Sequence, residues 1–161
     1  MNRRRSLKAF GIFAFTSYNW KVFARNSPSK MYDWVYIFGK SDSGQKYLEY
    51  CNSTFGSFTN ISSQLEDLPF YLSHKNYDYW RAIIMDTLAK HHKEDNLLII
   101  LNGCSYPEKI IGDIASKNIQ IWVDRPLQLS KKEKESFPPD TFSNITLVHM
   151  DGTNAHFKSV V

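Results

Sequence analysis

The stretch that decides the fold is NLLIILNGCSYPEKIIGDIASKNIQIWVD, residues 96–124. The apolar run 97–101 predicts a buried strand, which ends at the small and polar residues 102–105. The apolar spacing over 106–117 predicts a helix, and IQIWVD at 119–124 is typical of a second strand. A strand, a helix and a strand joined by short connections indicate a right-handed crossover between parallel strands.

The same alternation continues on both sides of this unit. The further expected elements are strands over 8–15, 34–38 and 144–150 and helices over 41–52, 76–93 and 131–136. Residues 53–75 are rich in Ser, Thr and Gly without a clean period, and are predicted to be mostly loop. Strands such as LLIIL need not alternate in polarity when both faces of a sheet are covered. We therefore predict an α/β fold, a Rossmann-like three-layer sandwich with a mostly parallel sheet, whose strand order the pattern does not specify.

Side chains that can cap a helix precede three of these helices. An oxygen of such a side chain accepts a hydrogen bond from a free backbone amide of the first turn, and a Glu three residues later can bond back. The expected caps are Asp42 or Ser43, the capping box of Ser105 with Glu108, and the capping box of Ser130 with Glu133.

Length and composition predict one ordinary globular domain. The chain has 161 residues, 42% hydrophobic and 22% charged, with no uninterrupted apolar run of the about 18 residues that span a bilayer. We expect a basic N-terminal arm at 1–8 and a single domain over 9–161. Cys51 and Cys104 lie in or beside expected core elements, which favours buried free thiols over a disulfide and a reducing, cytoplasmic location without membrane association. The high content of Lys, Asn, Ile, Phe, Tyr and Ser is compatible with an AT-rich bacterial or phage genome.

The net charge of +4 is concentrated near the N-terminus. The first 25 residues hold six Lys and Arg and no Asp or Glu. The segment NRRRSLKAFGIFAF partly resembles a twin-arginine export signal, but Ser6 replaces a large apolar residue there and the apolar run is short. We favour a basic tail that leads into a first buried strand. Association with nucleic acid through this arm is a less favoured alternative, because such surfaces usually spread basic residues along a face.

The candidate ligand site follows from the topology, since ligands of such sheets bind beyond the carboxyl ends of the strands. The loop GKSDSGQK, 39–46, is the best phosphate cradle, with backbone amides freed by glycines, lysine charge and a helix N-terminus. It is not a P-loop, because Lys and Ser or Thr do not follow its second glycine. An ordinary capped turn is the competing interpretation. The cradle candidates in this loop are Gly39, Lys40, Ser43 and Gly44.

Further candidates lie at the ends of the later strands. Gly103, Ser105 and Arg125 are predicted to contact ligand, although an ion pair of Arg125 with Asp124 or with another neighbour is the favoured interpretation for that residue. Asp124 and His149 are the candidate catalytic bases. Against these roles stand an ion pair for the carboxylate and a core or edge position for the histidine.

The remaining reactive residue types point to no defined chemistry. Cys104 could act as a nucleophile, although a packing thiol is the preferred interpretation. His91 and His92 point about 100° apart on a helix and cannot bind one ion together. We therefore predict a solvated helix end at these histidines, no metal site and no cofactor.

The segment 96–126, NLLIILNGCSYPEKIIGDIASKNIQIWVDRP, resembles a unit in the N-terminal half of two-domain glycosyltransferases of the spore-coat and capsule polysaccharide type. In those enzymes a strand ends in a small-residue corner, a Pro-Glu-started helix follows, and a second strand finishes near Asp and Pro. The resemblance covers about a fifth of the chain and implies a Rossmann-like half of a transferase. Such enzymes bind the sugar nucleotide mainly in a second domain. The resemblance therefore implies a fragment, a half that needs a partner, or a reused non-catalytic domain.

The leading functional hypothesis is a domain that binds a nucleotide, a nucleotide sugar or another phosphorylated small molecule at this strand-end cleft. If the protein is an enzyme, we expect transfer or hydrolysis at a glycosidic or phosphate centre. The alternative is a small non-catalytic protein that regulates or antagonises another macromolecule. A protein partner or a homo-oligomer is compatible with either hypothesis.

Overall fold

The computed structural model describes residues 32–70 and 73–160, and the part from Tyr32 onward forms one compact unit. The predicted basic arm at 1–8 and the predicted strand at 8–15 lie outside the described residues. In chain order the elements are β1 (Trp34–Gly39), α1 (Ser41–Phe55), β2 (Asn60–Leu65), α2 (His74–Leu88), β3 (Leu97–Asn102), α3 (Pro107–Ile114), β4 (Ile119–Val123), α4 (Lys131–Ser136), a 3-10 turn (Thr141–Asn144), β5 (Ile145–Asp151) and β6 (Asn154–Ser159).

The strands form a six-stranded sheet in the order β2-β1-β3-β4-β5-β6. All neighbouring pairs are parallel except β5 with β6. The first five strands thus follow the 2-1-3-4-5 order of flavodoxin-like doubly wound sheets. The predicted α/β fold, a Rossmann-like three-layer sandwich with a mostly parallel sheet, is confirmed.

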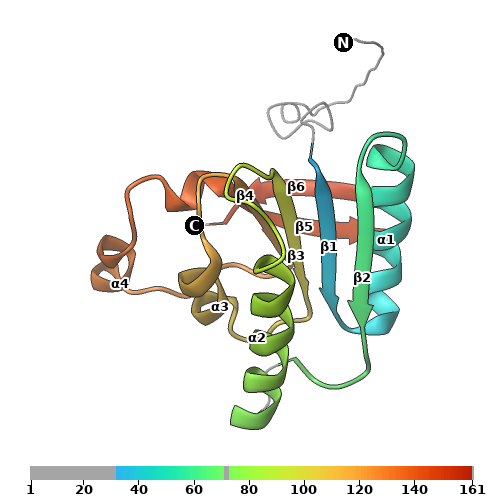
Figure 1. Cartoon of the computed structure of the whole chain (residues 1–161). Coiled ribbons are helices and arrows are strands. Elements are labelled where there is room, and N and C mark those ends of the chain that lie inside the picture. Colours follow the sequence, from blue (N-terminus) through green and yellow to red (C-terminus); the bar gives the residue numbers. More distant parts are fainter. Residues whose placement is uncertain (1–31, 71–72, 161) are drawn as a thin grey trace. The chain divides into compact units, whose positions relative to one another are not determined.

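Helices cover both faces of the sheet, with α2 and α3 on one side and α1 on the other (Figure 1). Alternate residues of each central strand point to opposite faces: Ile99 packs in the core beside α2 and α3, and Ile100 packs in the core beside α1. All six residues of β3 are buried. The quoted run LLIIL is therefore apolar throughout because neither of its faces meets water. Within the described residues no helix combines the length and apolar character needed to cross a bilayer.

The helix predictions hold in position but differ at the ends. The capping box of Ser130 with Glu133 is present as predicted. The box of Ser105 with Glu108 is wrong: α3 begins one residue later, with Tyr106 as its N-cap, because Pro107 favours the first helical position. Glu108 instead accepts the backbone amide of Gln128 at 2.5 Å.

The predicted caps of α1, Asp42 or Ser43, are also wrong, because both residues lie inside the helix, which begins at Ser41. The N-cap is Lys40, without a side-chain hydrogen bond. Ser43 donates its hydroxyl to Asn102 on β3 at 2.7 Å, and Ser41 donates to Asp67. α1 also runs three residues past the predicted end at Asn52.

The prediction that 53–75 is mostly loop is wrong for the last turn of α1, for the edge strand β2 and for the start of α2 at His74. Residues 56–59 and 66–70 lie outside helices and strands, as predicted. The sequence of β2, NISSQL, is polar because the strand has one neighbour and leaves most of its side chains exposed or half-buried. Ile61 and Leu65 pack on the α1 side and supply the weak alternation that marks it as a strand.

The second element that the sequence reasoning missed is β6. It returns antiparallel to β5 through the residues Gly152 and Thr153, and the φ of +63° at Gly152 suits a tight turn that glycine favours. Ala155 and Phe157 pack beside α1, whereas the alternate residues are exposed. An Asp-Gly pair followed by an alternating run is a hairpin signal, and it was available in the sequence.

Candidate functional site

The carboxyl ends of β1 and β3 lie side by side at the point where the strand order reverses. From β1 the chain crosses to β2 on one side, and β3 then lies on the other side of β1. In open α/β sheets this switch point is where ligands bind. The loops that meet here are 39–44 and 102–105, the two stretches singled out from the sequence.

Two glycines let these loops approach closely. Gly39 has a φ of 130°, and a Cβ at this position would lie 1.8 Å from the carbonyl oxygen of Asn102. Gly103 has a φ of 78°, and a Cβ there would lie 2.8 Å from Cδ of Lys40. Gly39 thus requires glycine for both backbone conformation and space, because its neighbour is backbone. Gly103 requires glycine for backbone conformation, since the flexible Lys40 side chain could move aside.

Asn102 joins the two loops with its side chain. This residue is fully buried, its Nδ2 donates to the Lys40 carbonyl oxygen at 2.8 Å, and its Oδ1 accepts from Ser43 at 2.7 Å. Its backbone carbonyl accepts the Lys40 amide at 3.3 Å. The hydroxyl group of Ser43, a predicted cradle residue, therefore donates its proton to Asn102 and connects the two loops.

Gly44 lies inside α1 and is buried. Its amide donates to the Lys40 carbonyl at 3.0 Å, as the first hydrogen bond of the helix. A Cβ here would lie 2.5 Å from the Leu65 side chain and 3.1 Å from Asn102 Nδ2. Close packing of α1 against β2 and β3 explains this glycine.

The end of β4 completes the same corner. Asp124 accepts the Gly103 amide at 2.7 Å, and Arg125 donates to the Ser105 carbonyl oxygen at 2.7 Å. Although Asp124 is exposed, protein atoms around its carboxylate displace water and raise its pKa, while the Gly103 amide, Arg125 and Lys40 oppose the rise. Each side chain thus reaches back to the loop after β3, and the ion pair considered between Asp124 and Arg125 is not formed.

His149 lies apart from this corner. It is exposed on β5, on the sheet face opposite to α1, and its ring centroid is 6.5 Å from that of His156 on β6. Within the part of the chain that the structure describes, no hydrogen bond or ion pair joins His149 to Asp124. The other predicted site residues gather along the carboxyl edge: Gly39, Lys40, Ser43, Gly44, Gly103, Ser105, Asp124 and Arg125.

The two cysteines are buried and unpaired, as the sequence predicted. Burial raises the pKa of the Cys104 thiol to about 12 and that of Cys51 to about 12. The thiol of Cys104 is therefore protonated at neutral pH, which supports a packing role over a nucleophilic one.

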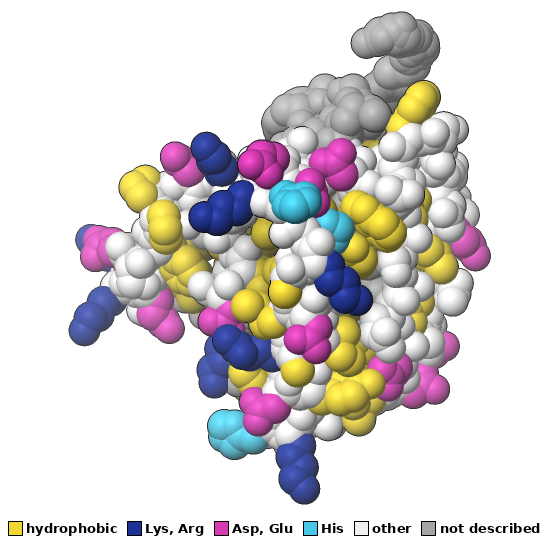
Figure 2. Space-filling model, in the orientation of Figure 1, with side chains coloured by type: hydrophobic (Ala, Val, Ile, Leu, Met, Phe, Trp, Pro, Cys, Tyr) yellow, Lys and Arg dark blue, Asp and Glu magenta, His cyan; other side chains and the backbone are white. Residues whose placement is uncertain are grey.

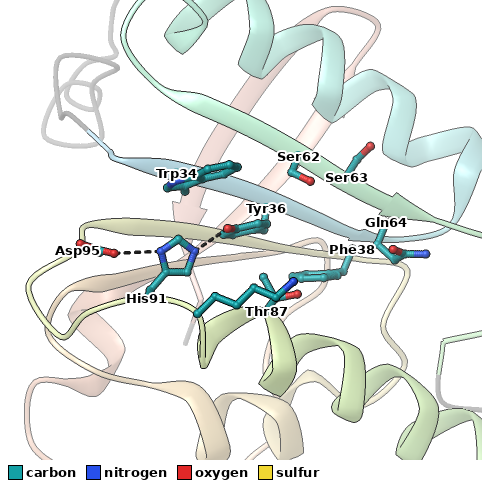
Figure 3. A pocket seen from close by; sticks show the side chains of 10 residues that line it. Trp34, Tyr36, Phe38, Ser62, Ser63, Gln64, Thr87, His91 and Asp95 are labelled. Carbon is teal, nitrogen blue, oxygen red and sulfur yellow. Dashed lines mark hydrogen bonds and ion pairs between the residues drawn. The ribbon is translucent and has the colours of Figure 1, made fainter.

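A second feature, which the sequence reasoning missed, is a cavity of about 580 Å³ on the α2 side of β1 and β2 (Figure 3). Ten residues line it: Trp34, Tyr36, Phe38, Ser62, Ser63, Gln64, Thr87, Lys90, His91 and Asp95. The alternating aromatic residues of WVYIF were the available signal, since they place three rings on one face of β1.

His91 is held inside this cavity by two hydrogen bonds. Its Nε2 lies 2.5 Å from the Tyr36 hydroxyl, and its Nδ1 lies 3.0 Å from the Asp95 carboxylate. The side chain is 8% exposed. The prediction of a solvated helix end is therefore wrong for His91, because α2 ends at Leu88 and the following turn folds the imidazole back against β1.

On the face that carries α2, acidic and basic side chains are mixed (Figure 2). This visible surface of the described residues has no continuous basic stripe of the kind that follows a nucleic-acid backbone. Among residues 32–70 and 73–160 there is also no group of three or more side chains placed to hold a metal ion.

Fold and corner together define a doubly wound, Rossmann-like α/β domain with a polar switch point at the ends of β1, β3 and β4. The chain matches none of the protein-family models, curated proteins or solved structures with which it was compared. The functional inference therefore rests on the geometry of the molecule.

Proposed function

We propose that this domain binds a small molecule carrying phosphate and hydroxyl groups, such as a nucleotide or a nucleotide sugar, over the carboxyl ends of β1, β3 and β4. The observation that carries the proposal is the convergence of Lys40, Asp124 and Arg125 at the topological switch point. Two strands that are far apart in the sequence, β1 before Lys40 and β4 before Asp124 and Arg125, deliver these charged groups to one edge of the sheet.

Lys40 is the candidate contact for the phosphate. The residue is exposed, its side chain crosses over Gly103, and it stands directly before the 15-residue helix α1. The N-terminus of a helix carries a partial positive charge, which adds to that of the ammonium group. Both charges favour an anion placed above the Gly39 turn.

Asp124 is the candidate contact for a hydroxyl group. A carboxylate has about four acceptor positions, and the Gly103 amide and the backbone amide of Asp124 itself bond to it. The remaining capacity faces the edge of the sheet, where the residue is exposed. If the domain catalyses a reaction, Asp124 is the candidate base for transfer or hydrolysis at a phosphate or glycosidic centre, and the rise in its pKa brings it closer to the range of a working base.

A thermal-shift panel tests the proposal. The probes are AMP, UDP, UDP-glucose and inorganic phosphate, and a true ligand at a hundredfold excess over its dissociation constant should stabilise the protein by about 2.7 kcal/mol. Lys40→Ala should weaken binding about tenfold or more, because a charge-assisted contact is worth about 1.5–3 kcal/mol. Asp124→Asn should weaken ligands with hydroxyl groups but not inorganic phosphate.

Lys117→Ala is the matched control, since Lys117 is exposed in the turn before β4, at the opposite edge of the sheet. An equal loss of affinity in this variant would mean that Lys40 acts only through the net charge of the protein and does not contact the ligand. If no probe of the panel stabilises the protein, the proposal fails and the non-catalytic interaction protein becomes the better hypothesis.

A further inference from the structure

The cavity beside α2 is a second place that can hold a small molecule, separate from the carboxyl-edge corner. Its volume of about 580 Å³ falls within the range of about 300–1,000 Å³ that ligand pockets occupy. It lies over β1 and the edge strand β2, flanked by α2, whereas the corner lies beyond the strand ends (Figures 1 and 3). No residue that lines the cavity is among the ligand-binding or catalytic residues predicted from the sequence.

An aromatic wall forms one side of the cavity. Trp34 and Tyr36 have ring centroids 5.4 Å apart and planes inclined by 5°, and Tyr36 and Phe38 have centroids 6.2 Å apart and planes inclined by 18°. The three rings thus run nearly parallel along β1. Trp34 and Tyr36 remain half-buried because the cavity, and not a helix, lies against part of their surface.

Hydrogen bonds link Asp95, His91 and Tyr36 in a row beside the aromatic wall, and they determine whether the Tyr36 hydroxyl can donate or accept. The Asp95 carboxylate lies 3.0 Å from His91 Nδ1 and accepts from the His92 amide at 3.2 Å. When the imidazole is neutral, this contact places its single proton on Nδ1. Nε2 then accepts the Tyr36 hydroxyl proton at 2.5 Å. Because this proton is committed to His91, the Tyr36 oxygen can offer only lone pairs to another group.

Beside the aromatic wall, the cavity is also lined by residues with amide, hydroxyl and ammonium groups. The parallel register pairs Tyr36 with Ser62 and Phe38 with Gln64, which places Ser62 and Gln64 on the same face of the sheet as the aromatic rings. Lys90 is exposed at the rim. The Asp95 carboxylate keeps its charge, but hydrogen bonds from His91 and from the His92 amide engage its Oδ2 atom.

We propose that this cavity binds a small, uncharged, flat-faced ring compound whose hydroxyl or amino group donates a hydrogen bond to the Tyr36 oxygen. The ring packs against the aromatic wall, and Ser62 and Gln64 bond its other polar groups. Both a free sugar ring and a nucleobase present this chemistry. Aromatic surface with a few fixed polar groups is the usual way in which proteins hold such rings.

The test uses probes that lack phosphate, so that its result is independent of the carboxyl-edge site. Glucose, galactose, adenosine and uridine are titrated into the full chain, and binding is followed through backbone-amide NMR shifts. The expected result is saturable binding of one class, with shifts at residues 34–38, 62–64 and 87–95. The sugar and nucleoside arms show which ring is bound.

Tyr36→Phe keeps the ring and removes the acceptor oxygen, and should weaken binding about tenfold or more. Tyr79→Phe is the matched control, because Tyr79 is an exposed residue of α2 outside the cavity and its hydroxyl donates to Glu66. Gln64→Ala is a second variant at an exposed edge-strand position, where folding is not at risk, and should also weaken binding. Lys40→Ala should leave binding of these probes unchanged.

The proposal is overturned if neither class binds at concentrations up to about 10 mM, a level at which even millimolar dissociation constants are detected. It is equally overturned if the shifts map to the ends of β1, β3 and β4, or if Tyr36→Phe and Gln64→Ala both bind as the unaltered chain does.

Discussion

The hydroxyl of Ser43 donates to the side-chain oxygen of Asn102 at 2.7 Å, which ties the first turn of α1 to the end of β3. Asn102 is fully buried, so its oxygen has no water to replace this donor. We expect Ser43→Ala to lower the free energy of unfolding by about 1–3 kcal/mol, the cost of an unsatisfied buried group. Urea denaturation measures this change.

Ser53→Ala is the control for this substitution in the same helix. Ser53 is exposed in α1, and alanine has the higher helix propensity, so the variant should be neutral or slightly stabilised. An equal loss of stability in both variants would mean that the Ser43 hydroxyl does not hold the corner.

Gly39→Ala should be among the most destabilising single changes in the sheet. The added Cβ would lie 1.8 Å from the Asn102 carbonyl oxygen, and the φ of 130° is strained for alanine. We expect a loss above about 4 kcal/mol or failure to fold, since this contact can be relieved only by moving backbone. Gly112→Ala in α3, where the nearest side-chain atom would be 3.9 Å away, should be neutral or gain up to about 1 kcal/mol. Tolerance of Gly39→Ala would show that β1 and β3 do not meet as closely as described.

The two cysteines should be almost inert in the folded protein. Since the pKa of each thiol is raised to about 12, the thiolate fraction at pH 8 is about one in ten thousand, against about one in four for an unperturbed thiol. A disulfide reagent at pH 8 should label both cysteines promptly in urea and only slowly in native buffer. Prompt labelling of one native cysteine would indicate that its thiol is accessible and activated.

The bond between Asp95 and His91 should make stability depend on acid pH. The His91 side chain holds the pKa of Asp95 below its ordinary value, with a smaller contribution from the His92 amide. A carboxyl group with a lowered pKa in the folded state stabilises the protein above the pKa of the unfolded chain, about 3.9, and this stabilisation is lost as the pH falls below that value. The free energy of unfolding of Asp95→Asn should therefore approach that of the unaltered chain between about pH 4 and pH 2.

Asp86→Asn, an exposed change on α2, is the control for this pH profile and should run parallel to the unaltered chain. If Asp95→Asn also runs parallel over the whole range, the hydrogen bond with His91 does not contribute to folding.

The alternation of strands and helices could be predicted from the sequence, because the buried strands are apolar and the apolar residues of the helices recur with a clear period. The edge strand β2 could not be predicted in this way. Its residues Ser62, Ser63 and Gln64 are polar, as in a loop, because the strand is exposed or half-buried. The end of α2 could not be predicted either. The turn that folds His91 onto Tyr36 depends on a contact between residues 55 positions apart in the chain. Local patterns record burial and caps, whereas these features are decided by tertiary partners.

The candidate corner was foreseen as a set of loops but not as a structure. Because the carboxyl ends of parallel strands lie at one edge of a sheet, Gly103, Asp124 and Arg125 were expected to lie together. The structure places them at that edge. The role of Asn102 was missed, because an asparagine after a strand is a common turn residue and its two partners are known only from the folded chain. His149 shares a strand-end position in the sequence, but the alternation along β5 places it on the exposed face of the hairpin.

The most direct measurement of the central claim is a backbone-amide NMR titration with UDP-glucose, AMP and inorganic phosphate. If the switch point is the ligand site, at least one probe should shift the amides of 39–43, 103–105 and 124–125 together, and Lys40→Ala should weaken that response while Lys117→Ala leaves it intact. Shifts confined to the amino ends of the strands, or no saturable shift with any probe, would contradict the account.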